Sequence, residues 1–193
     1  VIAGGTVDRA FSPKAGLVYM PNENLSVFAT YTNSFSANTG IDINYNSLTP
    51  SIIDQFEVGM KKNFWNNAVA LNLSLYQIEN RNFYQMAELN AQGQQNTDSL
   101  VKEFAGKMRS RGVELDVTGN PTPNLMIIAG VSYNHAVYLD TPEQFGYVEN
   151  QRLVRTPATT ANASVFYTLS DYIKGLKLGA SVYFVGDRIA GWN

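Results

Sequence analysis

The sequence contains no cysteine, few charged residues and no long apolar run, and each shortage excludes a class of protein. Without cysteine there is neither a disulfide scaffold nor a thiolate metal site. Lys and Arg number 14 against 16 Asp and Glu, which indicates no basic surface for nucleic acid. Charged residues make up 16%, below the roughly 25% of soluble domains. The longest apolar run, Leu125–Val131, is far shorter than the ~20 residues of a membrane helix.

The two ends of the chain lack the features of natural termini. The sequence opens on Val1 and Ile2, without an initiator methionine, a charged leader or a signal peptide, and it closes on Gly191–Asn193. We therefore expect an internal stretch of a longer protein. Aromatic residues are plentiful, with 11 Tyr, 10 Phe and 2 Trp. Low charge, many aromatics and no helical span together fit a membrane protein that crosses as strands.

Apolar and polar residues alternate in segment after segment, as in strands with two different faces. Alternation predicts that Val58, Leu73, Leu115 and Val182 face outward, whereas Glu57, Asn72, Glu114 and Ser181 face inward. A water-filled lumen accepts such carboxylates, which a lipid face excludes. The only helical element considered is a short turn around residues 97–104. Eight strands are expected, over residues 15–20, 25–35, 55–61, 69–75, 111–118, 125–137, 160–169 and 176–185.

The connections between these strands alternate between short and long. Asn, Pro, Gly and Ser are frequent in the short ones, as tight turns require. Short turns at one end and long loops at the other are typical of outer-membrane barrels, which have periplasmic turns and extracellular loops. Aromatic residues toward both strand ends agree with the two girdles of such barrels. The short connections cover residues 21–24, 65–67, 120–124 and 170–175, and the long ones 36–53, 82–107 and 138–159.

These patterns predict an all-β fold, namely an antiparallel transmembrane β-barrel segment of about eight strands in the bacterial outer membrane. We expect an open segment, in which the strands at residues 15–20 and 176–185 each lack one neighbour. Two other architectures remain open. Eight strands could close into a small self-contained barrel that serves as an anchor or adhesin. A soluble carbohydrate-binding sandwich is the other alternative.

Several short segments also carry a family resemblance. They are Leu48–Ser51, Asp54–Lys61, Met108–Val117, Thr118–Leu125, Gly130–Tyr133 and Val185–Arg188. In order and spacing these segments are similar to the barrel of TonB-dependent outer-membrane siderophore receptors, and they cover nearly the whole chain. Ser51 stands where that family usually has Glu, and Phe56 where it usually has Tyr.

The resemblance implies a 22-stranded barrel whose lumen is closed by a plug. Residues 1–193 would then be part of one receptor barrel domain, with the plug domain and the TonB box outside this chain. It implies uptake of a ferric siderophore, with TonB and outer-membrane lipid as further partners. Cobalamin, haem or an oligosaccharide are alternative cargoes within the same family. We expect neither an enzyme nor a resident cofactor.

Residues that bind the transported ligand are expected in the long loops. Aromatic faces and Arg donors can hold a bulky iron chelate without a protein ligand to the iron. No cluster of Asp, Glu and His has metal-ligand spacing. The lone His135, with Asp140 nearby, leaves a protease site or a haem contact open, although an ordinary strand-end residue fits better. The candidate ligand-binding residues are Tyr45, Arg81, Phe83, Tyr84, Phe145, Tyr147 and Arg152.

Overall fold

The computed structural model describes residues 9, 11–87, 89–141, 148–169 and 173–190, and this part of the chain is built of strands. It contains no helix that is long and apolar enough to cross a membrane. All strands belong to one sheet. The strands are β1 (Lys14–Asn22), β2 (Leu25–Ser36), β3 (Ile41–Asp42), β4 (Ser51–Phe64), β5 (Val69–Met86), β6 (Val101–Thr122), β7 (Leu125–Asp140), β8 (Thr159–Thr168) and β9 (Lys177–Val185).

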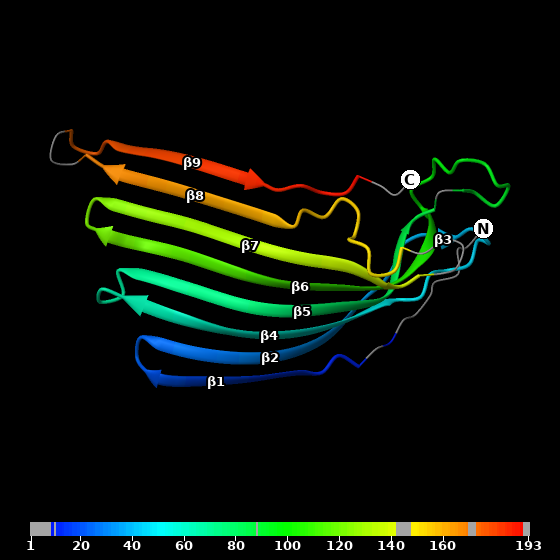
Figure 1. Ribbon diagram of the computed structural model, residues 1–193, viewed down its shortest axis with the longest axis horizontal. Coiled ribbons are helices and arrows are strands. Elements are labelled where there is room, and N and C mark those ends of the chain that lie inside the picture. The colour runs from blue at the N-terminus through cyan, green and yellow to red at the C-terminus, as the bar shows by residue number, and fades with distance from the viewer. Residues whose placement is uncertain (1–8, 10, 88, 142–147, 170–172, 191–193) are drawn as a thin grey trace.

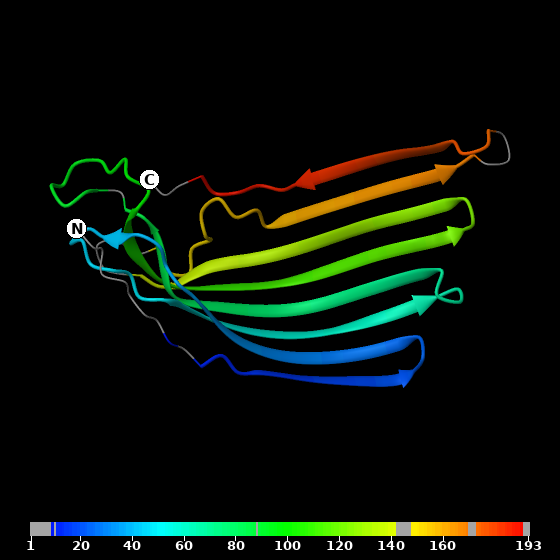
Figure 2. The same cartoon turned by 180° about the vertical axis from the view of Figure 1, so that it is seen from behind.

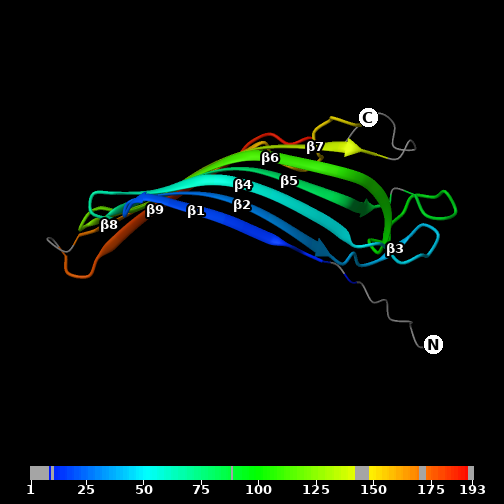
Figure 3. The same cartoon turned by 90° about the horizontal axis from the view of Figure 1, so that it is seen from below.

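The sheet is an antiparallel meander in the order β1-β2-β4-β5-β6-β7-β8-β9, with the short β3 added in parallel to β6. The eight expected strands are thus confirmed. Figure 1 shows β1 and β9 at opposite edges, and Figure 3 shows that the sheet is curved and twisted. Among the described residues β1 pairs only with β2 and β9 only with β8. The segment is therefore open, which argues against the self-contained eight-stranded barrel.

The strand register sorts the side chains into two faces, as the alternation predicts. Leu115 lies on the apolar face and Glu114 on the polar face. A lipid bilayer accepts the first face and a wet lumen the second, so we refer to them as the outward and the lumen face. One row of paired residues across the outward face is Tyr19, Val27, Met60, Leu73, Leu115, Val131, Ala161 and Phe184. The adjacent row on the lumen face is Ser26, Lys61, Asn72, Asp116, Gly130, Asn162 and Tyr183.

Glycines within the strands lie beneath aromatic rings of the neighbouring strand on the lumen face. A Cβ atom at Gly59 would overlap the ring of Phe28, and one at Gly112 would overlap the Tyr76 hydroxyl. Phe166 covers Gly179 in the same way. The rings fill the space that a missing side chain leaves, so these glycines permit close packing on an otherwise single-layered sheet.

The outer ends of β5 and β6 are longer than the sequence predicts. β5 continues to Met86 and β6 begins at Val101, so the long connection is 87–100 and the expected limits of 82–107 are wrong. The short helical turn considered around residues 97–104 is not formed over its second half, because Lys102 and Glu103 pair with Met86 and Gln85 in the sheet. Two register shifts between Asn80 and Tyr84 accompany this extension, and Asn82 adopts a positive φ of 57°.

Gly106, in this extension of β6, should tolerate no side chain. Its φ is +84°, and an added Cβ would overlap the backbone carbonyl of Asp140. Gly93 has a similar φ of +74°, but a Cβ atom added there would have no other atom within 4 Å. We expect Gly93→Ala to cost only the left-handed backbone penalty of about 1–2 kcal/mol, whereas Gly106→Ala must also displace β7. The midpoints of urea unfolding of the purified receptor measure this difference, and equal midpoints would contradict it.

Candidate functional site at the outer ends of the strands

Packed side chains concentrate at one end of the sheet, where the long connections fold against the strands. Figures 1 and 2 show these connections and β3 together at that end, with the short turns at the other. We call the loop end the outer end, as in outer-membrane barrels. In the described part of the chain the buried apolar residues are Leu48, Ala87, Ala136, Val137 and Tyr138, all at or near this end. The long connections therefore pack against the strand ends instead of extending freely from them.

The first long connection, residues 37–50, crosses to β6 and forms β3 there. Ile41 and Asp42 pair in parallel with Val101 and Lys102, and the Ile41 N–H donates to the Leu100 carbonyl at 2.9 Å. Gly40 allows this approach, because a Cβ there would overlap the Leu100 carbonyl. The connection between β2 and β4 is thus attached to the one between β5 and β6.

Asp42 orders the exposed tip that follows β3. Its carboxylate accepts hydrogen bonds from the backbone N–H groups of Asn44 and Asn46, both at 2.8 Å, and from the Asn46 side-chain amide at 3.0 Å. The Asn46 side chain, followed by the backbone of Asn46 and then Asn44, holds the pKa of Asp42 below its ordinary value. This turn presents Tyr45, whose φ is 65° and whose residue surface is 69% exposed.

The first connection is also tied to β5 where it enters β4. Ser51 is buried, and its hydroxyl donates to the Asn82 carbonyl at 2.8 Å. The Asn82 amide in turn donates to the Pro50 carbonyl at 3.1 Å, and Asn38 donates to Ser51. Ser51, the residue that departs from the family pattern, therefore closes a polar contact between two strands. This contact explains why a small hydroxyl fits the position.

The second connection, residues 87–100, is closed at its base by Asn96. The buried side-chain amide of Asn96 donates to the carbonyls of Ala87 and Asp98, both at 2.9 Å, and to that of Val101 at 3.3 Å. A backbone hydrogen bond from Ala87 to Val101, 3.0 Å long, continues the β5–β6 ladder up to this point. The loop is therefore anchored on the strands rather than simply extended from them.

The described part of the third connection, residues 141 and 148–158, returns along the outer end of β7. Asn150 donates to the Tyr138 carbonyl and Leu153 to the Ala136 carbonyl, each at 2.8 Å, which explains the burial of this part of β7. Arg152 forms an ion pair with Asp187 at 3.1 Å. Asp187 belongs to the segment after β9 that carries the family resemblance, so the pair fastens the loop to the chain beyond β9.

The structure places the candidate ligand residues in different settings. Tyr45 lies at a loop tip, and Arg152 lies in a loop but is held by Asp187. Phe145 and Tyr147 lie outside the described residues. The loop placement of Arg81, Phe83 and Tyr84 is wrong, because all three lie within β5. Arg81 forms an ion pair with Asp54 on the outward face, away from the lumen.

Sequence reasoning missed the residues that organise the loops. Thr49, Asn82 and Asn96 hold the connections in place, yet each is one of many polar residues in its segment. Their partners are carbonyl or hydroxyl groups 2 to 35 residues away. The frequent Asn residues of the connections indicated turns, but they do not specify which carbonyl group accepts a hydrogen bond from each side-chain amide.

Tyr84 joins β5 to the first connection through a side-chain hydrogen bond. Its hydroxyl and the Thr49 hydroxyl lie 2.9 Å apart. We expect Tyr84→Phe to loosen residues 37–50 without unfolding the barrel, since one hydrogen bond contributes about 0.5–1.5 kcal/mol net. Amide hydrogen exchange of the 37–50 segment measures this, and Thr49→Val is the matched variant. If the double variant exchanged much faster than either single one, the two hydroxyls would not act as a pair.

The lumen face carries a second polar feature, a groove of about 110 Å³ near the middle of β6, β7 and β8. Glu114 and Asp116 line it, and the Ser132 and Thr160 hydroxyls bond to each other at 2.7 Å. The register places both carboxylates on the polar face, opposite to that of Leu115, and their inward orientation stays a prediction. In the described residues no group of three or more His, Cys, Asp or Glu side chains could hold a metal ion.

An open antiparallel sheet with one apolar face, short turns at one end and folded loops at the other is the wall of an outer-membrane β-barrel. The family model for the TonB dependent receptor-like β-barrel matches residues 3–193. The chain therefore belongs to the TonB-dependent receptor family. This places it in the outer membrane of Gram-negative bacteria.

Characterised relatives are receptors for metal chelates. The metal-pseudopaline receptor CntO of Pseudomonas aeruginosa is 25% identical over 181 residues, covering 93% of this chain and 24% of the relative. The ferrioxamine B receptor of Salmonella typhimurium is 25% identical over 175 residues, covering 90% of this chain and 23% of the relative. The chain thus spans about a quarter of the length of these relatives.

A solved structure has the same fold. The alcaligin outer-membrane receptor FauA of Bordetella pertussis superposes with a TM-score of 0.65 at 20% identity. The match covers 93% of this chain and 30% of the FauA chain. The likeness extends over nearly all the strands described here and supports their assignment to the wall of a receptor barrel.

Proposed function

We propose that this chain forms part of the barrel wall and of the ligand-binding outer opening, here called the mouth, of a receptor that imports a ferric siderophore. The import is driven by TonB. The observation that carries the proposal is the outer end of the sheet, where the first two connections are fastened to each other and all three are fastened to the strands. A mouth of this kind can hold a bulky chelate in a defined orientation, because little ordering of the loops is needed on binding.

The chemistry expected at this mouth is recognition of the organic shell of the chelate. The exposed ring of Tyr45 can pack against apolar or aromatic parts of a siderophore. The chelate keeps its iron throughout, and the protein contributes rings and hydrogen-bond donors. The names of the ferrioxamine B and pseudopaline receptors support a metal chelate as cargo. The latter name favours a second candidate, a chelate of a metal other than iron.

Transport assays in cells test the proposal. The full-length receptor that contains this chain is expressed in cells lacking their own siderophore receptors, at low iron. We expect uptake of a radioactive iron chelate that disappears when TonB is deleted, while binding to the cell surface persists. Chelates of nickel, cobalt and zinc are tested in parallel. Uptake of cobalamin, haem or an oligosaccharide, without uptake of any metal–siderophore chelate tested, would overturn the siderophore proposal.

A further inference from the structure

The three long connections that form the mouth carry an excess of negative charge. They comprise residues 37–50, 87–100 and 141–158, and in the sequence the first two contain no Lys or Arg. The acidic residues of all three are Asp42, Glu88, Asp98, Glu143 and Glu149, and the basic ones are Arg152 and Arg155. Five acidic residues against two basic ones leave three negative charges at neutral pH. A charged ligand therefore approaches connections that are negative on balance.

One of the two basic residues is already engaged within the protein. Arg152 forms an ion pair with the Asp187 carboxylate at 3.1 Å, and its other terminal nitrogen donates to the Asp187 backbone carbonyl at 3.4 Å. Asp187 is followed by Arg188, so the segment after β9, residues 186–190, adds one charge of each sign. Arg152 is thus directed to Asp187 rather than to a ligand.

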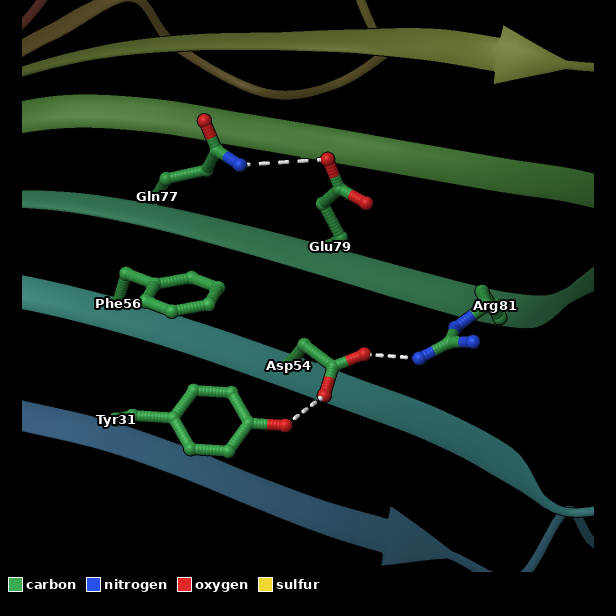
Figure 4. Close-up of a pocket in the computed structure, with 6 residues that line it drawn as sticks. All are labelled: Tyr31, Asp54, Phe56, Gln77, Glu79 and Arg81. Carbon is green, nitrogen blue, oxygen red and sulfur yellow. Dashed lines mark hydrogen bonds and ion pairs between the residues drawn. The ribbon is translucent and has the colours of Figure 1, made fainter. Parts of the chain in front are cut away.

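Basic side chains at the outer ends of the strands lie on the other side of the wall. Figure 4 shows Arg81 turned toward Asp54, with which it forms an ion pair on the outward face. Lys107 forms an ion pair with Glu79 at 2.8 Å and has Asp140 as its register partner. The basic residues that the register puts on the face of Leu115 are Arg81, Lys107, Arg109 and Arg111. The sheet itself separates them from a ligand in the mouth.

Charges on the lumen side of the strands balance one another. On the lumen face of the described strands, basic and acidic residues are equal in number: Lys14, Lys61 and Lys177 against Glu57, Glu114 and Asp116. Lys102 and Glu103 add one charge of each sign at the start of β6. The wall below the connections therefore does not offset their negative charge.

The first two connections also present uncharged side chains to solvent. Leu89 and Leu100 are 53% and 58% exposed, and the ring of Tyr45 is exposed as well. β3 holds the two connections together, because Ile41 pairs with Val101. Aliphatic groups suit the hydrocarbon linkers of a ligand, and side-chain amides suit its carbonyl oxygens. The exposed amides of these connections are those of Asn44, Asn46, Gln92, Gln94 and Gln95.

We propose that the mouth selects a ferric chelate of zero or positive net charge, of the trihydroxamate type, over an anionic tricatecholate. This selectivity rests on the proposed function, the import of a ferric siderophore. Each hydroxamate group loses one proton when it binds iron, so three of them balance the charge of Fe³⁺ and leave a neutral centre. Each catechol group loses two protons, so three of them leave three negative charges. The acidic connections repel such a complex and slow its approach.

Variants assign the selectivity to the first two connections. Asp42→Asn with Asp98→Asn removes two negative charges, while the asparagine oxygens can still accept the backbone hydrogen bonds that the carboxylates accept. We expect the double variant to bind a negatively charged trihydroxamate about threefold more tightly and a neutral one with unchanged affinity. Glu23→Gln, which removes a carboxylate at an inner turn, is the control and should change neither affinity. An unchanged ratio of the two affinities in the double variant would overturn the proposal.

A series of chelates that differ only in charge needs no variant and covers the case in which the double variant fails to fold. The iron complex of desferrioxamine B, a linear trihydroxamate with a terminal amine, carries one positive charge. Acetylation of the amine makes the complex neutral, and succinylation gives it one negative charge. We expect its affinity for the purified full-length receptor to fall by about tenfold over this series in ~10 mM salt, and by less than about threefold in ~500 mM salt, where charges are screened.

Ferric enterobactin, a tricatecholate, and a neutral cyclic ferric trihydroxamate are titrated alongside. Equal affinity over the charge series, or tighter binding of the tricatecholate than of every trihydroxamate, would overturn the selectivity and leave the import of a ferric siderophore intact. The same holds if the receptor imports another ferric siderophore and binds none of the trihydroxamates. Binding of no ferric chelate at all would overturn the proposed function and the selectivity together.

Discussion

Replacing Leu73 with arginine should sharply reduce the amount of folded receptor in the membrane. Leu73 lies within β5, in an apolar row with Met60 and Leu115, and we expect it near the bilayer midplane because a tilted strand crosses the hydrocarbon core in about 9–11 residues. An arginine on the lipid face at the bilayer midplane costs about 2–4 kcal/mol. Such a loss lowers the folded fraction of a marginal barrel by tens to hundreds of times. Heat-modifiable gel mobility of the membrane fraction measures it.

Asn72→Arg is the matched control, since it differs by one position in the same strand. Asn72 faces the lumen between Lys61 and Asp116, whose opposite charges nearly cancel at that point. Water in the lumen can hydrate a guanidinium group there, so the folded yield should stay close to that of the unmodified receptor. A similar loss for both variants would contradict the assignment of the two faces.

The faces of this sheet could be predicted from the sequence because strand geometry has a period of two. Once Leu115 and Glu114 are placed in a strand, they must lie on opposite faces, and the register confirms that they do. The open edges at β1 and β9 were predictable as well, given the family resemblance. Neither inference needed long-range partners, because the first rests on local alternation and the second on the resemblance.

The outer ends of β5 and β6 could not be predicted in the same way. Asn82 takes a left-handed conformation, and register shifts follow it, so the alternation is lost although the strand continues. Phe83 and Tyr84 therefore looked like loop residues. Likewise β3 has only two residues, and its parallel partner Val101 lies 60 positions away in the sequence. A pairing this short leaves no periodic signal.

The candidate site was predictable as a region but not as a set of contacts. The long connections do meet at the outer end, as the spacing indicates. Arg81 is turned outward to Asp54 and Arg152 is paired with Asp187, and neither ion pair follows from local sequence. A groove of about 400 Å³ at the outer ends of β4 and β5, whose lining includes Asp54, Phe56 and Glu79, was missed because its residues alternate with apolar ones in segments that were interpreted only as membrane wall.

Replacing residues 88–99 with a short turn containing Asn-Gly should abolish most cargo uptake while the barrel still assembles. The exchange keeps Ala87 and Val101, whose 3.0 Å hydrogen bond closes the β5–β6 ladder, and Leu100, which accepts from Ile41. Asn-Gly suits a tight connection between two antiparallel strands. The proposed mouth would lose the whole second connection, including the surface that Asn96 holds in place.

Loss of several contacts of about 1 kcal/mol each would lower affinity for the chelate by more than tenfold. Uptake at low iron and binding to whole cells both measure the effect, with the folded yield determined on the same samples. Asn66→Gly at the inner turn is the control, because its φ of 51° suits glycine and it lies at the opposite end. Normal uptake of every siderophore by the loop-exchanged receptor would exclude this connection from the site. Equal loss with Asn66→Gly would instead point to a general defect in the barrel.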